Sequence, residues 1–380
     1  MSKPVRIGMV GLGQRGLQHL KALWKIEDAN IVALCDPFAD NLEPEKISRF
    51  VEGYSSVGIE TYTAFGDMLA AGGLDAIYFC IPPNRHGGEV IAAVGAGIHV
   101  FVEKPVSLYY DEAIAMESAI HESGVIGTVG FNLRHDPKNE AIRDFVQDRR
   151  LVMGTAVVSG TLESHSAKHT RTEELGGPSN RVWAASAAWS GTTVVEAGIH
   201  QLDTMRYWAG DVAWTRADYV HRDPEDIEDG GDNPYAYSVT FGFESGLLFN
   251  LLLARLRKTF FSDGYASLMW DHGHVKVEGP EIAAYYYDGP YPPASSPSGG
   301  ELRHVLPLPA EREATFHINQ CFVDAVSQGD RNILRNTFTS SMNSHSAVLA
   351  ANLSDQLGGR KIYLNDFATN AEFADFRRKP

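Results

Sequence analysis

Two small groups of residues in this chain have types and spacing suited to acid–base chemistry. Lys104 lies in the tripeptide Glu103-Lys104-Pro105, directly after the apolar run His99–Val102, and proline could hold a tight turn there, with a cis bond, that aims the amine inward. Glu196 and His200 are four residues apart in a predicted helix and therefore share a face. A carboxylate beside a histidine fixes its tautomer and raises its basicity, which suits a general base. The alternatives are a surface turn and a surface ion pair.

A glycine-rich stretch, Gly11-Leu12-Gly13-Gln14-Arg15-Gly16, predicts a nucleotide site. It follows the apolar run Val5–Val10 and leads into Leu17–Trp24, predicted to be a strand and a helix. This is the context in which G-x-G-x-x-G binds a dinucleotide. The three glycines permit, in order, a tight turn, close approach of backbone N–H groups to a pyrophosphate, and packing of the helix on the strand. The helix N-terminus adds a partial positive charge.

A dinucleotide-binding unit of this kind also needs an acidic residue after its second strand, and the chain has one there. The apolar run Ile31–Cys35 ends at Asp36, twenty residues beyond Gly16. Its carboxylate can accept hydrogen bonds from the adenosine ribose hydroxyls. It would repel a 2′-phosphate, and no arginine follows it in residues 37–40, so NAD is favoured over NADP. A glycine-rich turn in some other α/β domain is the alternative.

The secondary structure that must position these residues is predicted to differ between the first and second parts of the chain. In the first part, predicted strands alternate with helices, which indicates a doubly wound parallel sheet. The predicted strands are Val5–Val10, Ile31–Cys35, Ala76–Ile81, His99–Val102 and Val125–Phe131, and the helices include Phe65–Ala71, Glu89–Ala96 and Asp111–Glu122. We predict a Rossmann domain over residues 1–130.

The second part, residues 131–380, is predicted to be an α+β domain with a large, mainly antiparallel open sheet, because short strands adjoin one another. Its first strand is Val152–Thr161, followed by the helix Val194–Ala209. Further strands are predicted at Arg216–His221, Ala236–Phe243, Leu247–Leu253, Ala266–Trp270, His274–Glu278 and Ile282–Tyr287, before a loop at Asp288–Gly300 and helices at Ala314–Ser327 and Ser340–Gln356. These closing helices could pack back on the first domain.

The length, charge and cysteine content of the chain indicate which kinds of protein are compatible with it. A chain of 380 residues favours two domains, and a net charge of −15 disfavours nucleic acid and anionic membrane as partners. Cys35, Cys80 and Cys321 are isolated in apolar contexts, which is typical of free thiols in a reducing compartment rather than of a disulfide framework or a zinc knuckle. No signal-peptide pattern begins the chain, and the stretch Leu247–Ala254 is too short to span a bilayer. We therefore expect a cytoplasmic protein.

Other polar residues carry weaker signals. Asn132 and Arg134 follow one predicted strand, and Pro82-Pro83-Asn84-Arg85-His86 follows another, so both groups are expected at the carboxyl edge of the first sheet. Trp183 and Trp189 could stack on a sugar face or pack in the core. The spacing of Glu163, His165 and His169 could hold a metal, but polar histidine-rich loops seldom do, and we expect no metal.

Taken together, the motifs resemble the glucose–fructose oxidoreductase and inositol dehydrogenase family (Gfo/Idh/MocA) of NAD(P)-dependent enzymes. They run in family order across the first 210 residues, and the strand-rich remainder fits the family's second domain. The matching segments are Gly11–Gly16, Asp36, Pro82–His86, Glu103–Pro105, Gly130–Arg134 and Glu196–Asp203. The chain departs from the family at Glu196, where the family most often has aspartate.

The resemblance implies roles for these residues. His200 would take a hydroxyl proton while hydride leaves to NAD, and Lys104 would hold the substrate oxygen and stabilise developing charge, with Glu196 completing the catalytic group. The implied cofactor-binding residues are Gly11, Leu12, Gly13, Gln14, Arg15, Gly16, Asp36, Ile81, Pro82, Asn84, His86, Glu103, Lys104 and Asn132. The implied substrate-binding residues are Lys104, Arg134, His165, Trp183, Glu196 and Asp203. The resemblance also implies a homo-oligomer, a dimer or tetramer, formed through the open face of the second sheet.

Three functions remain open at this point. The first is an NAD-dependent dehydrogenase that oxidises a secondary hydroxyl of a sugar, cyclitol or related polyol. The second is a glycosidase that recycles tightly bound NAD and releases aglycone without net NADH. The third is an NAD-binding regulatory protein, which has no need of Lys104, Glu196 and His200. The sequence does not identify the particular substrate.

Overall fold

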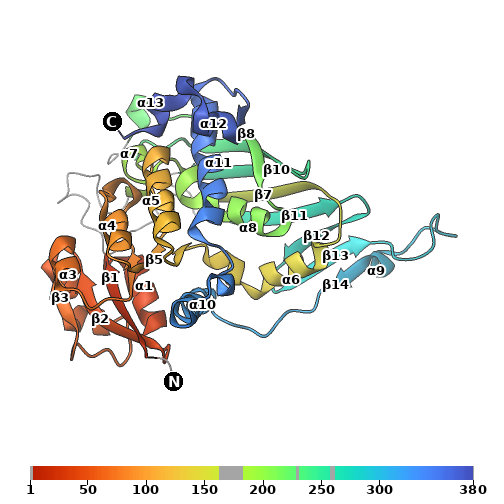
Figure 1. Cartoon of the computed structure of the whole chain (residues 1–380). Helices are drawn as coiled ribbons and strands as arrows, with labels where there is room; N and C mark the ends of the chain where they lie inside the picture. The colour runs from red at the N-terminus through yellow and green to blue at the C-terminus, as the bar shows by residue number, and fades with distance from the viewer. Residues whose placement is uncertain (1–2, 162–182, 228–230, 257–261, 380) are drawn as a thin grey trace.

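The buried apolar runs of the first part form six parallel strands in the order β3-β2-β1-β4-β5-β6. The computed structural model describes residues 3–161, 183–227, 231–256 and 262–379, and Figure 1 shows their arrangement. The strands are β1 (Val5–Val10), β2 (Ala29–Cys35), β3 (Glu60–Tyr62), β4 (Ala76–Phe79), β5 (His99–Val102) and β6 (Gly127–Val129). The strand order reverses between β1 and β4, which opens a crevice at their carboxyl ends. The predicted doubly wound parallel sheet is confirmed.

Helices cover both faces of this sheet. They are α1 (Gln14–Leu23), α2 (Pro44–Ser48), α3 (Phe65–Ala71), α4 (Glu89–Gly95) and α5 (Tyr110–Ser123). Two predicted strands were too long: they end at Phe79 and Val129, because the chain then turns toward Pro82-Pro83 and toward Gly130. The edge strand β3 was not predicted, since it is short, polar and largely exposed and so has no apolar periodicity.

The second sheet has nine strands in the order β14-β13-β12-β11-β7-β10-β9-β8-β15. They are β7 (Leu151–Thr161), β8 (Val212–Val220), β9 (Ala236–Phe243), β10 (Leu248–Leu256), β11 (Asp263–Trp270), β12 (Gly273–Glu278), β13 (Glu281–Tyr286), β14 (Arg303–Val305) and β15 (Ile362–Tyr363). The β7–β10 pair is parallel and the other neighbours are antiparallel, so the predicted mainly antiparallel sheet is confirmed.

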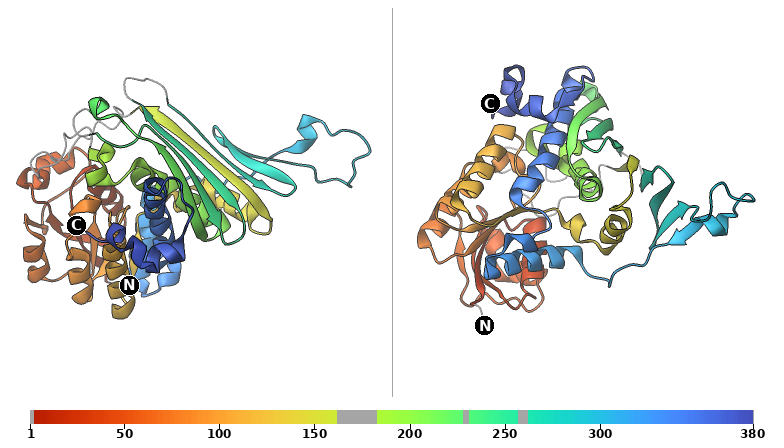
Figure 2. Two further views of the ribbon diagram at one scale, coloured as in Figure 1. Left: turned by 90° about the horizontal axis from the view of Figure 1, so that it is seen from above. Right: turned by 45° about the vertical axis from the view of Figure 1, so that its right-hand side comes forward.

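Within the described residues, helices cover one face of the second sheet and leave the other bare, as the left view of Figure 2 shows. The helices of this part are α6 (Pro137–Val146), α7 (Ala187–Ser190), α8 (Ile199–Ala209), α9 (Gly299–Leu302), α10 (Ala314–Gln328), α11 (Phe338–Gln356), α12 (Leu364–Thr369) and α13 (Ala374–Arg377). The 3₁₀ turns η3 (Asn132–His135) and η6 (Trp183–Ala185) precede α6 and α7, and η2 (Pro83–Arg85) lies in the first part, between β4 and α4.

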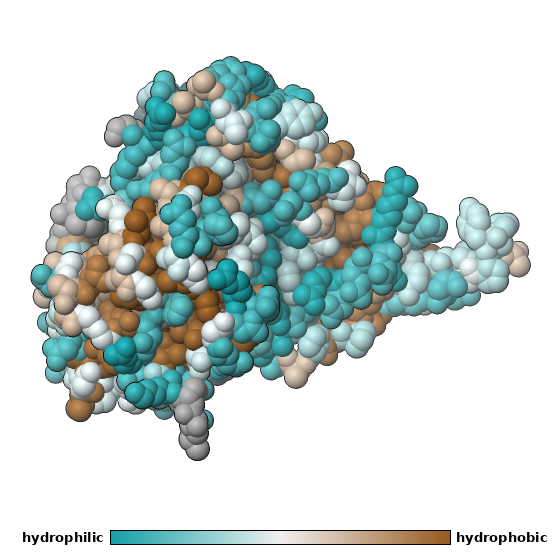
Figure 3. Space-filling view, viewed as in Figure 1, coloured by the Kyte–Doolittle hydropathy of each residue, from teal (hydrophilic) through white to brown (hydrophobic). Residues whose placement is uncertain are grey.

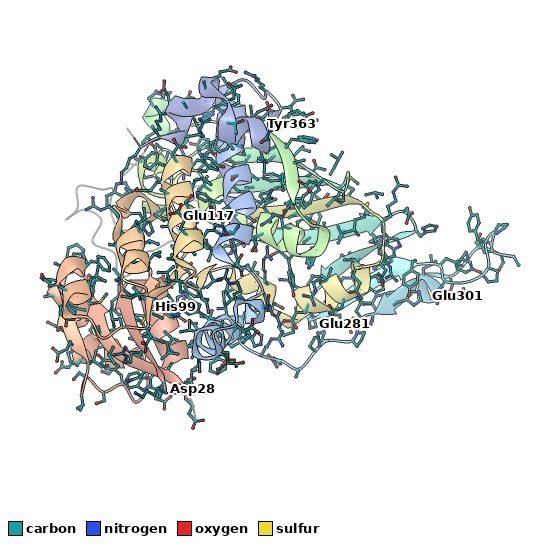
Figure 4. All side chains as sticks on the ribbon, in the orientation of Figure 1. Asp28, His99, Glu117, Glu281, Glu301 and Tyr363 are labelled. Atoms are coloured by element: carbon teal, nitrogen blue, oxygen red, sulfur yellow. The ribbon has the colours of Figure 1, made fainter. Side chains whose placement is uncertain are left out.

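The last long helices return to the first domain. On α10, Ile318 and Phe322 share an apolar cluster with Leu20 of α1. On α11, Thr339 donates to Glu117 of α5 at 2.7 Å, and Figure 4 labels Glu117 beside that helix. The same helix α11 packs along β8. Its position between the two sheets ties the domains together.

The segment between β13 and β14 projects from the body of the molecule, and Figure 4 labels Glu301 on α9, where the segment returns to β14. Its surface is mostly hydrophilic in Figure 3. The short helix α9 ends the predicted loop, and it forms because Ser298 and Glu301 make a reciprocal capping box. In the part of the chain that the structure describes, no helix combines the length and apolar character needed to cross a bilayer.

Candidate active site

The glycine loop between β1 and α1 has the backbone geometry that a dinucleotide cradle needs. Gly11 has φ +90°, and a Cβ there would collide with the carbonyl oxygen of Cys80. A Cβ on Gly16 would collide with the carbonyl oxygen of Gly11, so glycine is required for α1 to approach the loop. Gly13 caps α1 without a side-chain hydrogen bond, and the first turn of α1 holds no acidic residue. The loop therefore fits an anionic pyrophosphate.

Asp36 directly follows β2, and its side chain contacts the glycine loop. Its carboxylate is 4% exposed and accepts from the backbone N–H groups of Leu12 at 2.8 Å and Phe38 at 3.0 Å, and from Asn41 Nδ2 at 3.0 Å. A carboxylate has about four lone-pair sites, so three are used and about one is left for a ribose hydroxyl. The position fits the predicted cofactor role, which stays a prediction.

Glu103 is the centre of a buried network rather than an exposed cofactor ligand. Its carboxylate accepts from Arg15 Nε and pairs with His19 Nε2, both at 2.7 Å, and it accepts from the Lys104 N–H at 3.0 Å. A Cβ on Gly130 would overlap this carboxylate, so glycine makes room for it. Burial alone would raise its pKa, but Arg15 and His19 hold the pKa of Glu103 well below its usual range. The carboxylate thus stays charged and fixes Arg15 in the fingerprint.

Sequence reasoning missed two members of this network. His19 is fully buried on α1, and its Nδ1 lies 3.1 Å from Asn319 Oδ1 on α10, 300 residues away. Burial and the Arg15 guanidinium lower the pKa of His19, so its imidazole is neutral. A polar residue on the otherwise apolar face of α1 was the available signal for His19. No local signal could have linked it to Asn319.

The predicted Lys104–Glu196 neighbourhood is present in the structure. Lys104 follows β5, its peptide bond to Pro105 is cis as predicted, and its Nζ donates to the backbone oxygen of Glu196 at 2.7 Å and to Glu196 Oε1 at 3.1 Å. Their side chains are 12% and 21% exposed, respectively. A partly buried ammonium therefore meets a carboxylate at the junction of the two domains.

The segment carrying Glu196 differs from the predicted continuous α-helix. Val194–Gly198 forms a π-helical turn, and α8 begins only at Ile199. A Cβ on Gly198 would be 3.0 Å from Leu253 Cδ1 and 3.1 Å from Leu251 Cδ2, so the segment lies tightly against β10. Such widened turns occur often at functional sites.

His200 lies one residue into α8. Its Nδ1 is buried and has no hydrogen-bond partner among the residues that the structure describes. Burial and the Lys104 ammonium lower the pKa of His200 to about 3, while the Glu196 carboxylate opposes this change. The imidazole is therefore neutral at pH 7 and can accept a proton.

Arg134 and Asp203 were predicted to contact the substrate, but the structure pairs them with each other. Arg134 Nε and Nη2 donate to the two Asp203 oxygens at 2.7 and 2.8 Å, and the residues are 7% and 2% exposed. Ser344 of α11 also donates to Asp203 at 2.8 Å. This side of α8 is thus partly buried, because α11 packs against it. A contact of Arg134 or Asp203 with substrate stays a prediction.

The motif after β4 brings further predicted residues to the sheet edge. The Oδ1 atom of Asn84 is buried without a hydrogen-bond partner within the described ranges, so it can accept from a ligand. Ile81 contacts the glycine loop, since a Cβ on Gly11 would be 3.1 Å from Ile81 Cγ2. His86, in contrast, is 1% exposed and its Nδ1 pairs with Glu89, so its side chain is buried and has a partner within the protein.

The remaining predicted residues are placed as follows. Pro82 precedes η2, Asn132 begins η3, and Gln14 is exposed at the start of α1. Trp189 is 7% exposed and lies 5.9 Å from the Arg85 guanidinium, which favours the packing alternative for that tryptophan. Only the backbone of Trp183, in η6, is described, and Glu163, His165 and His169 lie outside the described residues.

Comparison with known proteins identifies a family model for the first domain and relatives that align over more than half of the chain. Residues 5–131 match the model of an oxidoreductase family with an NAD-binding Rossmann fold. A myo-inositol 2-dehydrogenase of Thermotoga maritima is 30% identical over 246 residues, which are 64% of this chain and 66% of that protein. A scyllo-inositol 2-dehydrogenase (NAD(+)) of Bacillus subtilis is 29% identical over 55% of each chain. The alignments thus span about half to two thirds of these curated relatives.

Solved structures match over nearly the whole chain. An oxidoreductase from Agrobacterium radiobacter, in complex with NAD+, L-tartaric acid and magnesium, has a TM-score of 0.75 at 15% identity and covers 96% of this chain and 100% of its own. The WlbA dehydrogenase from Bordetella pertussis, in complex with NADH and UDP-GlcNAcA, has a TM-score of 0.73 at 19% identity, over 95% and 99% of the two chains. At these identities the likeness establishes the fold of both domains.

Proposed function

Because this chain belongs to the Gfo/Idh/MocA oxidoreductase family, with its NAD-binding Rossmann fold, we propose that it is an NAD-dependent dehydrogenase that oxidises a secondary hydroxyl of a sugar, cyclitol or related polyol. The relatives named as inositol dehydrogenases support this substrate class. The proposal covers the activity of the whole chain, beyond the part that the alignments span.

One observation carries the proposal: a continuous chain of contacts joins the glycine loop to the candidate catalytic residues. Arg15 of the fingerprint pairs with Glu103 at 2.7 Å, Glu103 precedes Lys104, and Lys104 Nζ lies 3.1 Å from Glu196 Oε1. Lys104 also follows β5, whose carboxyl end lies at the edge where open α/β sheets bind ligands. A cofactor on the loop and a substrate at Lys104 would therefore be neighbours.

Each candidate residue has a separate role in the proposed oxidation. NAD, when bound, supplies the hydride acceptor. Lys104 holds the substrate oxygen and stabilises the charge that develops on it. His200 is neutral and accepts the hydroxyl proton, and Glu196 favours the resulting imidazolium by its negative charge. Glu103 keeps Arg15 and Lys104 in place, and Asp36 accepts from the adenosine ribose.

The test is absorbance at the NADH band while purified protein and NAD meet a panel of free sugars, inositols and glycosides. Steady NADH formation with one polyol is expected and would identify the substrate class. Release of aglycone without net NADH would replace the dehydrogenase by a glycosidase that recycles its cofactor. NAD binding with neither product would favour a regulatory protein.

Asp36→Asn is expected to shift the ratio of the catalytic efficiencies with NAD and NADP toward NADP by about 10-fold or more. A hydrogen bond to a charged group contributes about 1.5–3 kcal/mol, and about 1.4 kcal/mol corresponds to a tenfold change in affinity. The change also removes the charge that would repel a 2′-phosphate. Arginine is a poorer test here, since the site is only 4% exposed. Kinetics with each cofactor measure the ratio, with the exposed nearby Glu45→Gln as control. An unchanged ratio in Asp36→Asn would contradict the assignment.

We also propose that the bare face of the second sheet is the contact between subunits of a homo-oligomer. Large apolar side chains are exposed on it: Met153 is 37%, Leu248 43%, Leu252 42% and Tyr265 55% exposed. They come from the adjoining strands β7, β10 and β11 and share a face by their register. Leu252→Glu is expected to yield monomers in sedimentation experiments that find a dimer or tetramer for the unaltered protein. A monomeric unaltered protein would refute the proposal.

A further inference from the structure

Two histidines and a cysteine meet where α10 passes η3. His135 ends η3, and His317 and Cys321 lie on α10. The Nδ1 atoms of His135 and His317 are 2.9 Å apart, and Cys321 Sγ is 3.9 Å from His317 Nδ1. One ligand atom from each residue lies within 4.8 Å of the others. Nitrogen and sulfur atoms are the ligands that zinc prefers in proteins.

The backbone around the cluster is fixed independently of any ligand. His317 and Cys321 are four residues apart on α10 and therefore share a face. That helix is held by the apolar cluster with α1, and His135 is 1% exposed. Arg312 Nε donates to the backbone oxygen of His135 at 3.2 Å, which ties η3 to the segment before α10. The three side chains thus come from two segments whose separation is already set.

Two of the three distances between the ligand atoms are close to those of a tetrahedral site, and the third is within 4.8 Å. Zinc–nitrogen bonds of about 2.0–2.1 Å and a zinc–sulfur bond of about 2.3 Å place tetrahedral ligand atoms roughly 3.3–3.6 Å apart. The observed 2.9 and 3.9 Å differ from this by a few tenths of an ångström, within the reach of side-chain rotation. Water can supply the fourth ligand, as in zinc sites that have three protein ligands.

The charges nearby are compatible with a cation. Arg312 acts electrostatically on all three residues, and its guanidinium pairs with Glu140, a carboxylate that it shares with Arg335. The carboxylate of Asp324 lies near enough to act electrostatically on both His317 and Cys321. The alternative without a metal is a set of hydrogen bonds that joins His135 to His317 and His317 to the Cys321 thiol.

We propose that His135, His317 and Cys321 bind a zinc ion that joins η3 to α10. Cys321, which the sequence suggested was an isolated thiol, is a ligand in this site. The ion adds a further link to α10, the helix that carries Asn319, the partner of His19, and so strengthens the attachment of α10 to the first domain. The proposal does not depend on the identity of the substrate or cofactor.

Zn²⁺ alone is the probe, titrated into the metal-stripped, reduced full-length protein in competition with a chromophoric chelator. One ion per chain is expected, and Cys321→Ala should weaken its affinity by at least about 10-fold. Cys35→Ala is the matched control, since it removes a free cysteine away from the cluster, and it should bind zinc as the unaltered protein does. Co²⁺ substitution should give a thiolate charge-transfer band that disappears in Cys321→Ala.

A second variant separates this site from the other histidine-rich segment. The double variant His165→Ala/His169→Ala should retain both the zinc affinity and the cobalt band. Loss of zinc in this double variant, with normal affinity in Cys321→Ala, would overturn the proposal. Absence of stoichiometric zinc binding in the unaltered protein would overturn it too, and would leave a hydrogen bond as the role of the two histidines. Because Cys321→Ala removes a half-buried side chain, circular dichroism confirms that the variant is folded.

Discussion

Lys104→Ala is expected to reduce turnover by roughly 10²-fold or more and to leave NAD affinity nearly unchanged. Acid–base and electrostatic groups contribute on this scale. The structure supports the separation of the two effects: Lys104 Nζ reaches the backbone oxygen and carboxylate of Glu196, whereas the glycine loop is held through Arg15 and Glu103. Steady-state kinetics on the polyol identified in the panel, with a fluorescence titration of NAD, measure the two quantities.

Lys276→Ala is the matched control for this change. Lys276 also pairs with a glutamate, Glu278, at 2.8 Å, but it lies 41% exposed on β12 of the second sheet. Its loss should leave turnover unchanged. Near-normal turnover in Lys104→Ala would remove Lys104 from the mechanism, and an equal loss of NAD affinity would assign it to the cofactor instead.

Asp203→Ala is expected to lower the free energy of unfolding by about 3–5 kcal/mol, the usual cost of breaking a buried ion pair by removing one partner. The variant leaves the Arg134 guanidinium buried without its bidentate partner. It also removes the acceptor of Ser344 and a neighbour 3.6 Å from Arg206. Chemical denaturation, followed by far-ultraviolet circular dichroism, measures the difference.

Asp144→Ala provides the surface comparison, because Asp144 and its partner Arg143 are 61% and 44% exposed and such pairs contribute at most about 1 kcal/mol. A double variant, Arg134→Met with Asp203→Leu, should recover part of the lost stability, since apolar groups can replace a buried pair. If Asp203→Ala instead keeps its stability and loses substrate affinity, Asp203 contacts substrate, as the sequence predicted.

Much of the fold and part of the site could be predicted because they depend on local order along the chain. A strand, a glycine-rich turn and a helix follow one another within residues 5–23, and their backbone requirements are expressed directly as glycine at Gly11 and Gly16. Asp36 and Lys104 could be placed for the same reason, since Asp36 directly follows a buried apolar run and Lys104 lies two residues beyond another. Parallel strands bring such positions to one edge of the sheet.

Short strands at the edges of the sheets could not be predicted in this way. The strand β3 and the strand β15 are too short or too exposed to show a period, and their pairing comes from the neighbouring strand. The π-turn before α8 was also missed, because its residues have an ordinary helical pattern. Packing of Gly198 against Leu251 and Leu253 accompanies the widened turn, and those residues lie more than fifty positions later.

The sequence by itself determined the nucleotide cradle, the two sheet types and the order of the motifs, since each depends on neighbours in the chain. The tertiary structure alone decided which distant side chains meet: Asn319 with His19, Arg134 with Asp203, and His135 with His317 and Cys321. Apolar periodicity specifies that a helix buries a face, but not which surface it is buried against. The return of α10 and α11 to the first domain fixed those partners.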